Sequence, residues 1–234
     1  MPTRIALVGM GKMGRALDQL APERGCEVVA RLEHDAVISR DTLAGADVAI
    51  EFTTPDASVG NQLALLDAGC AVVVGTTGWY AALPMVTARV AERDGALLWA
   101  PNFAIGVNIF QEIVAQAAAL LQGVAGFDAH LIETHHAAKK DAPSGTAGNL
   151  AKVASAALGR DLPITSVRTG SVPGTHELLF DAPFESIRLE HVARDRRVFA
   201  EGALAAARWL VGRRGVFTMR DVLAAAHTTG GGTR

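Results

Sequence analysis

Residues 4–14, RIALVGMGKMG, join a short apolar run to three closely spaced glycines. Residues 4–8 are apolar and partly β-branched, which is typical of a buried strand. The glycines follow in the spacing G-x-G-x-x-G, at the point where a helix is expected to begin. In a dinucleotide-binding turn they allow the tight turn, the approach of a pyrophosphate and helix–strand packing, in that order.

We therefore interpret this stretch as a dinucleotide-binding loop, and an ordinary tight turn is the alternative. The residues assigned to the loop are Gly9, Met10, Gly11, Lys12, Met13 and Gly14.

Strands and helices alternate from this loop to residue 100. Helices open at Pro55 and Pro84, since proline is favoured in the first turn. The other strand-like runs are residues 27–32, 48–53, 71–76 and 96–100. The alternation predicts an α/β fold whose N-terminal domain, residues 1–104, is a Rossmann-like parallel sheet.

The pattern changes after residue 104. A helix over 106–121, a strand over 128–136 and a helix over 149–159 precede three strand-like runs with no obvious helix between them. The three runs are residues 164–169, 176–180 and 186–192. We expect an α+β domain with an open mixed sheet over 105–205, then C-terminal helices over 206–234, with a disordered tail over 227–234.

The composition argues against several classes of protein. Half of the residues are hydrophobic and a fifth are charged, so the chain can bury a sizeable core. The net charge of -2 gives no support for nucleic-acid binding. The N-terminus lacks a signal peptide, and the longest apolar-rich run, residues 104–121, contains too many polar residues to span a membrane. With two cysteines and no disulfide framework, we expect a soluble cytoplasmic protein.

Three strand ends carry candidate cofactor contacts. Glu33 lies nineteen residues after Gly14, where a carboxylate can bind both ribose hydroxyls of NAD and repel the 2′-phosphate of NADP. The neighbouring residue is His34, which is not a permanent cation such as arginine, and Glu33 as a solvated loop residue is the alternative. We expect two further segments to line the nicotinamide end, although each alone fits an ordinary turn. They comprise Gly75, Thr76, Thr77, Ala100, Pro101, Asn102 and Phe103.

Residues 133–150, ETHHAAKKDAPSGTAGNL, place histidines and lysines just before a helix start. His135 and His136 point to opposite faces if they end a strand, and a buried structural histidine is the alternative for each. The helix start after Pro143 offers hydroxyls and N–H groups that bind a carboxylate or phosphate, although Ser144 alone would serve as an N-cap. Together they predict a site that binds an anion and transfers a proton.

The segment HHAAKKDAPSGTA, residues 135–147, resembles the signature H-H-x-x-K-x-D-A-P-S-G-T-A of the 4-hydroxy-tetrahydrodipicolinate (dihydrodipicolinate) reductase family. The resemblance extends to GMGKMG, EFTTPDA, GTTGW, APNFAIGVN, RTGSVPGTHELLF and MRDVL. It implies reduction of 4-hydroxy-tetrahydrodipicolinate by NADH or NADPH, in the diaminopimelate route of lysine biosynthesis. It also implies a homotetramer joined through the second domain's sheet, and last helices that return to the nucleotide domain.

The resemblance also implies residue roles. His135 matches the proposed proton donor, Lys139 the second catalytic group and His136 a substrate contact. Gly145 and Thr146, preceded by Ser144, match the clamp for a substrate carboxylate. The expected substrate is a small dicarboxylate, and no metal is required.

The chain departs from the family pattern at two places, and two other functions remain as alternatives. The family often carries arginine after the acidic residue of the second strand, where this chain has His34, and the connection that follows is short for the family. Both features bear on the choice of NAD or NADP.

One alternative function is that of a Rossmann dehydrogenase for another amino-acid imine, such as a diaminopimelate or aspartate dehydrogenase. The other is a non-catalytic nucleotide-sensing subunit, which the intact pair of His135 and Lys139 argues against.

Overall fold

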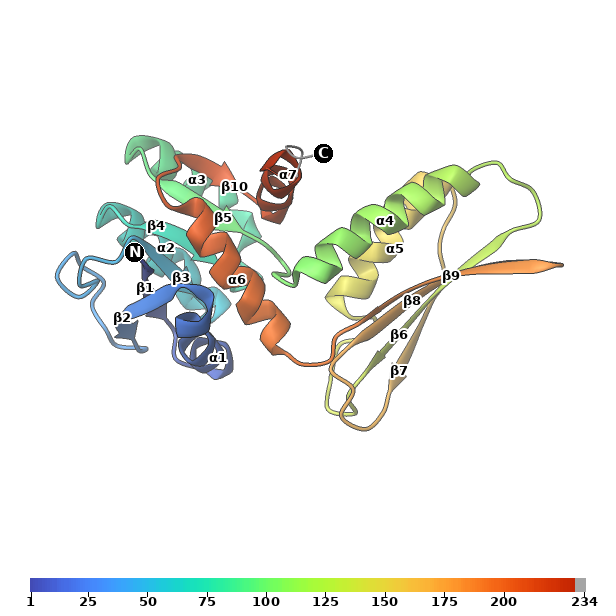
Figure 1. Cartoon of the computed structure of the whole chain (residues 1–234), viewed down its shortest axis with the longest axis horizontal. Coiled ribbons are helices and arrows are strands. Elements are labelled where there is room, and N and C mark those ends of the chain that lie inside the picture. The colour runs from blue at the N-terminus through green and yellow to red at the C-terminus, as the bar shows by residue number, and fades with distance from the viewer. Residues whose placement is uncertain (230–234) are drawn as a thin grey trace. The chain divides into compact units, whose positions relative to one another are not determined.

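The computed structural model describes residues 1–229 and divides into two compact units. Unit 1 comprises residues 1–105 and the chain from Arg197 onward, and unit 2 comprises Gly106–Arg196. The two units are coloured by chain position in Figure 1.

Unit 1 contains a six-stranded sheet in which every pairing is parallel. Its strands, in spatial order, are β10 (Gly215–Phe217), β5 (Ala96–Trp99), β4 (Ala71–Val74), β3 (Val48–Glu51), β1 (Thr3–Val8) and β2 (Cys26–Leu32). The chain order reverses beside β1, which lies between β2 and β3. Ligands of open α/β sheets bind outside the carboxyl ends of the strands at such a reversal.

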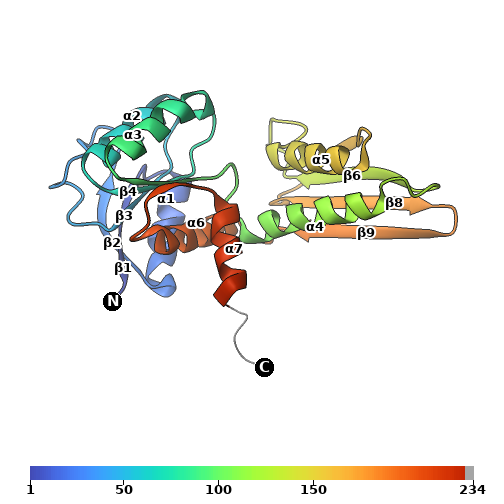
Figure 2. The ribbon, with the colours of Figure 1, turned by 90° about the horizontal axis from the view of Figure 1, so that it is seen from above.

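Helices cover both faces of this sheet, as Figure 2 shows. The two pairs are α1 (Lys12–Leu20) with α6 (Arg197–Leu210), and α2 (Pro55–Asp67) with α3 (Leu83–Glu92). Alternate residues of β1 enter the two resulting cores: Ile5 and Leu7 pack with α1 and α6, and Ala6 and Val8 pack with α2 and α3. Because both faces are buried, the strands are almost continuously apolar. Short 3-10 turns occupy Ala21–Arg24 and Tyr80–Ala82.

Unit 2 packs two helices on one face of a four-stranded mixed sheet (Figures 1 and 2). The helices are α4 (Ile105–Leu121) and α5 (Gly145–Leu158). The strands, in spatial order, are β7 (Ile164–Arg168), β6 (Asp128–His135), β8 (Thr175–Ala182) and β9 (Glu185–Val192). The pair β6–β7 is parallel and the other two pairs are antiparallel. The predicted combination of a Rossmann-like domain and an open mixed sheet is therefore confirmed.

Some boundaries differ from those predicted. The predicted boundary at residue 205 would divide α6, which lies wholly in unit 1 because Ala203, Leu204 and Ala207 are buried in its core. One strand was not predicted: β10, which has three residues and pairs with β5. Helix α7 (Met219–Thr229) includes the start of the tail predicted to be disordered, and residues 230–234 lie outside the described part of the chain. Among residues 1–229, no helix is both long and apolar enough to cross a bilayer.

Candidate functional site

The glycine loop joins β1 to α1, as predicted. A side chain at Gly9 would overlap the carbonyl group of Phe52, and one at Gly14 would overlap the carbonyl oxygen of Gly9, so packing explains both glycines. A side chain at Gly11 would meet no protein atom within 4 Å. Gly11 caps α1 without a side-chain hydrogen bond, and the first N–H groups of a helix have no partner within it. The open space at Gly11 therefore fits an anion bound at the start of α1.

Two adjoining cavities lie over the carboxyl ends of β1, β2, β3 and β4. The first, of about 500 Å³, joins Gly9, Met10 and Gly11 to Glu33 and His34. The second, of about 420 Å³, brings Lys12 and Met13 together with the loop after β4, Gly75 to Thr77. The structure therefore brings the predicted loop and the first two strand-end segments to one place in unit 1.

The segment after β5 differs from these. Ala100 and Phe103 are buried in the core, where Phe103 contacts Phe52 with ring centroids 6.1 Å apart. Asn102 accepts a hydrogen bond from the backbone of Ala104, 2.8 Å away, through its side-chain oxygen. Neither cavity is lined by Ala100, Pro101, Asn102 or Phe103. Their predicted contact with a nicotinamide ring stays a prediction.

A buried carboxylate, Glu51, organises the loops around both cavities. It accepts hydrogen bonds from the backbone N–H of Thr53 at 3.1 Å and from the hydroxyl of Ser58 at 2.9 Å. The N–H of Thr53 also donates to the hydroxyl of Thr76, at 2.8 Å, which links the loop after β3 to the loop after β4. Glu51 was not among the predicted site residues, although a glutamate at the end of an apolar strand is a recognisable signal.

The charges around Glu33 bear on which dinucleotide fits. Glu33 and His34 are exposed, and His34 contacts Asp35 at 2.8 Å. The guanidinium of Arg31 binds Asp18 at 2.5 and 2.9 Å. Arg15 was not predicted as a site residue, yet it lines the same cavity as Glu33. Its Nη1 donates to the carbonyl of Met10 at 3.2 Å.

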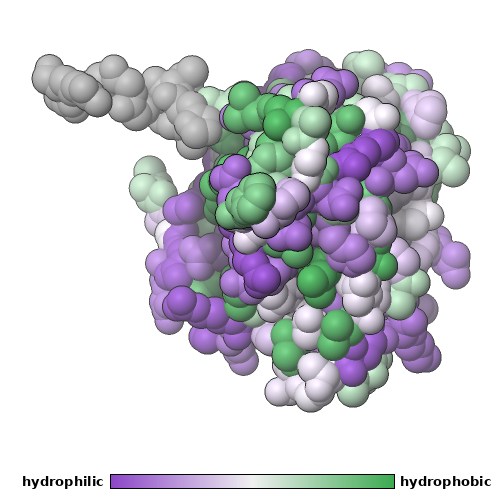
Figure 3. Space-filling model, turned by 90° about the vertical axis from the view of Figure 1, so that its right-hand side faces the viewer, coloured by the Kyte–Doolittle hydropathy of each residue, from purple (hydrophilic) through white to green (hydrophobic). Residues whose placement is uncertain are grey.

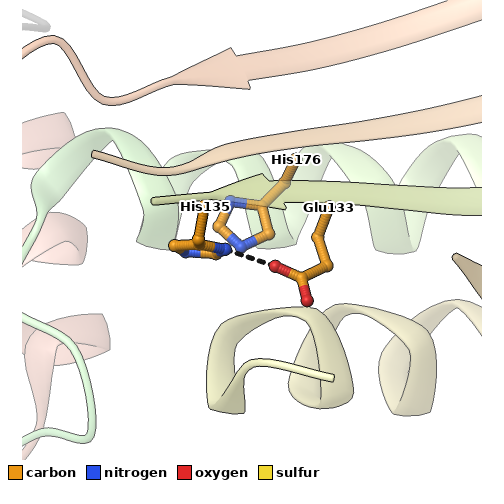
Figure 4. A group of neighbouring side chains, drawn as sticks. All are labelled: Glu133, His135 and His176. Atoms are coloured by element: carbon orange, nitrogen blue, oxygen red, sulfur yellow. Dashed lines mark hydrogen bonds and ion pairs between the residues drawn. The ribbon is translucent and has the colours of Figure 1, made fainter. Parts of the chain in front are cut away.

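The second cluster lies at the end of β6 in unit 2, where Glu133 and His135 share one face of the strand (Figure 4). Both side chains are buried, and Nδ1 of His135 is hydrogen-bonded to Oε2 of Glu133. The imidazole of His176, from β8, packs against His135 with ring centroids 5.3 Å apart. Both His135, which is expected to donate a proton, and its hydrogen-bonded partner Glu133 are therefore buried.

Glu133 has further hydrogen-bond partners besides His135. Its Oε1 accepts a hydrogen bond from Nη2 of Arg168 at 2.6 Å and from the backbone N–H of Ser144 at 3.3 Å. Burial alone would raise the pKa of Glu133, but hydrogen bonds from Arg168, Ser166 and His135 outweigh it and hold the pKa at about 2. The carboxylate is therefore ionised at every physiological pH.

Burial lowers the pKa of both histidines in this cluster. For His135 the hydrogen bond and charge of Glu133 act in the opposite direction, while Lys139 and Arg168 lower the pKa further. For His176 burial, together with His135 and His191, lowers the pKa to about 4. His176 is thus neutral near pH 7. The charge of Glu133 raises the pKa of both histidines, but of the two only His135 is hydrogen-bonded to this carboxylate.

The loop after β6 carries the predicted cation. Nζ of Lys139 binds the carboxylate of Asp141 at 2.7 and 3.0 Å, and this hydrogen bond lowers the pKa of Asp141. The carbonyl of Asp141 accepts from Arg168 at 2.6 Å, so the loop is attached to the buried cluster. His136 is half-buried, one residue beyond the strand.

Helix α5 begins at the predicted anion site. The hydroxyl of Ser144 accepts from the backbone N–H of Ala147 at 3.2 Å, which makes Ser144 an N-cap. Gly145 is exposed, and a side chain there would meet no protein atom within 4 Å; Thr146 is half-buried. The positive end of the helix thus lies beside the buried Glu133 cluster.

The donor atoms of Glu133, His135 and His176 lie within 4.8 Å of one another, close enough to hold a metal ion. The Glu133 carboxylate, however, already binds Arg168 and His135. We interpret the group as a hydrogen-bonded cluster, and the predicted absence of a metal stays a prediction.

Sequence reasoning missed Glu133, Arg168 and His176 as site residues. Glu133 could have been found, because it lies two residues before His135 on the same strand and so points to the same face. Arg168 and His176 come from β7 and β8, and only the strand register places them beside His135 and Glu133. No pattern of neighbouring residues in the sequence predicts that register.

The contrast between two glycines gives a test of the loop. We expect Gly11→Ala to change the free energy of unfolding by about 1 kcal/mol or less but to raise the Kd for NADH at least tenfold, which is about 1.4 kcal/mol. Gly14→Ala should instead lower stability by roughly 1–3 kcal/mol, because its side chain has no room. Thermal unfolding and fluorescence titration measure the two effects. Unchanged NADH binding by Gly11→Ala would contradict the assignment.

Comparison with known proteins agrees with both halves of this description. Residues 3–103 match the family described as "Dihydrodipicolinate reductase, N-terminus", and residues 106–223 match "Dihydrodipicolinate reductase, C-terminus". A 4-hydroxy-tetrahydrodipicolinate reductase of Christiangramia forsetii is 34% identical over 94% of this chain and 97% of its own length. One of Thiobacillus denitrificans is 36% identical over 95% and 99%.

A solved structure shows the same fold. The dipicolinate-bound dihydrodipicolinate reductase of Paenisporosarcina sp. TG-14 is 24% identical, with a TM-score of 0.78 over 93% of this chain and 98% of that one. The family matches cover the sequences of both units, and the full-length relatives are more than 30% identical. The chain therefore belongs to the dihydrodipicolinate reductase family.

Proposed function

We propose that His135, Lys139 and the start of α5 bind and protonate the substrate of this chain. Family membership makes the chain a reductase of 4-hydroxy-tetrahydrodipicolinate, at a step of lysine and diaminopimelate biosynthesis. One observation supports our assignment of residues: a histidine backed by a buried carboxylate lies in the same segment as a lysine and a helix start. The relative bound to dipicolinate shows that a planar dicarboxylate is a ligand of that protein.

The charges of this segment suit a dianionic substrate. Lys139 is held by Asp141, and a substrate carboxylate would compete for the same ammonium group. The backbone at Gly145 and Thr146, after the N-cap Ser144, would bind a second carboxylate at the positive end of α5. His136 would contact the substrate from the strand end. His135 would donate a proton as negative charge develops on the ring, and Lys139 would stabilise that charge.

For the cofactor we propose a nicotinamide dinucleotide bound at the two cavities of unit 1. The pyrophosphate would lie at Gly9 to Gly14, where Gly11 leaves open space at the start of α1. Glu33 and His34 would lie beside the adenosine ribose, and Thr76 and Thr77 nearer the nicotinamide end. When bound, the dinucleotide supplies the hydride for the reduction. The Glu51 network would keep the loops after β3 and β4 in place for it.

We also propose that the chain assembles as a homotetramer through the open face of the unit 2 sheet. Strand register and alternation place Ile132, Leu179, Val167 and Val192 on that face, and Val167 and Val192 are 37% and 49% exposed. Hydrophobic and hydrophilic residues are mixed on the side of the molecule that Figure 3 shows. Sedimentation equilibrium should give four times the chain mass, and a monomer at micromolar concentration would contradict this.

We also propose that the protein is located in the cytoplasm, where the buried free thiols of Cys26 and Cys70 would stay reduced.

The catalytic assignment predicts the effect of two substitutions. We expect His135→Ala and Lys139→Ala each to lower kcat by roughly a hundredfold or more, the usual contribution of an acid–base group. The Kd for NADH should change little, because neither residue belongs to unit 1. Lys152→Ala removes the same charge as Lys139→Ala from an exposed position of α5 and should leave both values near wild type. Near-normal turnover by both site variants would overturn the assignment.

The charges around Glu33 predict the cofactor. We expect kcat/KM with freshly formed 4-hydroxy-tetrahydrodipicolinate to be at least as high with NADH as with NADPH. The 2′-phosphate of NADPH would be repelled by Glu33, and at ~4 Å this repulsion is about 1 kcal/mol in water and larger at a protein surface. His34→Arg should shift the ratio toward NADPH by roughly 1–3 kcal/mol, the contribution of a charged hydrogen bond.

If the wild type instead prefers NADPH, the variant Arg15→Ala tests whether Arg15 is the cause. A wild-type preference for NADPH that Arg15→Ala removes would show that Arg15 binds the phosphate, since it lines the same cavity. That outcome would contradict the NADH prediction and leave the reductase assignment intact. Absence of turnover with either cofactor would contradict the proposed function itself.

A further inference from the structure

Glu133 connects several elements around His135. Its two oxygens bind His135 on its own strand, Arg168 on β7 and the backbone of Ser144 at the start of α5. The side chain of Glu133 is fully buried, and that of Arg168 is 18% exposed. The register supports the same arrangement, because His135 lies opposite Arg168 and Glu133 lies opposite His176. The carboxylate is therefore held from three sides and has little freedom to turn.

This arrangement assigns the proton on His135. An ionised carboxylate can only accept a hydrogen bond, so Nδ1 of His135 must carry the hydrogen in the bond to Glu133. Nε2 is then the nitrogen that can release or take up a proton. Nε2 lies against Gly174, where a side chain would come within 3.0 Å of it. The absence of a side chain at Gly174 thus leaves room at the reactive nitrogen.

We propose that Glu133 is a positioning residue, anchored by Arg168, that fixes the tautomer of His135 and stabilises its protonated form. The proposal rests on the proposed function, in which His135 donates the proton. The proton would leave from Nε2 to the substrate, while the Nδ1 hydrogen stays on the neutral imidazole in its bond to Glu133. Arg168 would act through Glu133 by keeping that carboxylate ionised and oriented.

The charged and titratable groups that face His135 come from each neighbouring element. Glu133 lies on its own strand, Arg168 on β7, His176 on β8 and Lys139 on the following loop. The start of α5 contributes the N-cap Ser144, which bears no charge. Among these groups only Glu133 is anionic, and it raises the pKa of His135, whereas burial, Lys139 and Arg168 lower it.

Replacing Glu133 by glutamine should therefore change the chemistry of His135 with little change in shape. The amide oxygen can still accept from Arg168, which leaves the amide NH₂ facing Nδ1 of His135. Nδ1 would then accept a hydrogen bond, and the neutral imidazole would carry its hydrogen on Nε2. The favourable charge of Glu133 would also be lost, so the pKa of His135 would fall. In catalytic triads, the corresponding change of carboxylate to amide lowers kcat by about 10⁴ through the wrong tautomer.

The first measurement is nitrogen NMR of imidazole-labelled protein, with His135→Ala to identify the signals of His135. We expect the neutral ring to carry hydrogen on Nδ1 in the wild type and on Nε2 in Glu133→Gln. This result does not depend on turnover, so it tests the inference even if the proposed function fails. If Glu133→Gln does not fold, the wild type alone still tests the proposal. A neutral His135 ring that carries its hydrogen on Nε2 would overturn it.

The second measurement is the pH dependence of kcat. A proton donor is active below its pKa, so kcat should fall as pH rises through the pKa of His135. In Glu133→Gln this falling limb should move to lower pH, with kcat reduced roughly a hundredfold or more and KM changed by less than about threefold. Glu133→Asp keeps the charge and should restore the wild-type position of the limb. Glu185→Gln makes the same charge change at an exposed position of β9 and should match the wild type.

The two measurements separate the possible outcomes. A reversed tautomer and a shifted limb that Glu133→Asp restores would support the positioning role. An unshifted limb with normal kcat in Glu133→Gln would overturn it. A loss of kcat with an unchanged tautomer and limb would show a merely structural role and would likewise overturn it.

Discussion

The ion pair between the buried Glu133 and the half-buried Arg168 constrains how the elements around it in unit 2 can be arranged. Removing one partner of a buried pair leaves an uncompensated charge, which is destabilising by roughly 3–5 kcal/mol. Glu133 therefore requires β7 beside β6, in the register that brings Arg168 opposite His135. It also requires α5 to begin beside the sheet, because the N–H of Ser144 is its third partner. The position of the start of α5, where we propose that an anion binds, thus follows from satisfying one carboxylate.

Unit 1 uses a buried carboxylate at the end of a strand in a different way. Glu51 accepts hydrogen bonds from Thr53 and Ser58, which are neutral, whereas Glu133 faces a guanidinium and an imidazole. Neutral donors orient a loop without supplying a nearby positive charge, which suits a cavity that would receive an anionic dinucleotide beside Glu33. A cationic partner has a second effect, because it keeps the carboxylate ionised next to the histidine that we propose as the proton donor. The difference in donors therefore matches the difference in what each loop is proposed to do.

The parts of the fold set by local pattern were predictable from the sequence. The glycine spacing and the alternation of elements predict β1, α1 and the parallel sheet, since each depends on residues close in the chain. Glu133 could also have been predicted as a site residue, because it is two residues from His135 on the same strand. Arg168 and His176 were not, because their closeness to the site depends on the pairing of β7 and β8 with β6. The strand β10 was missed for the same reason, as three half-buried residues next to β5 leave no periodic signal.

The way in which unit 2 is inserted into unit 1 also depends on long-range packing. The chain leaves unit 1 after β5 and returns with α6, so β10 joins the sheet only after unit 2 has been traversed. Gly202 of α6 lies against the carbonyl of Phe103 so closely that a side chain there would overlap it. The exit segment and the returning helix are thus packed together within one core. Phe103 also contacts Phe52, which follows the strand that carries Glu51. The burial of Phe103 therefore has a structural cause of its own, independent of any ligand.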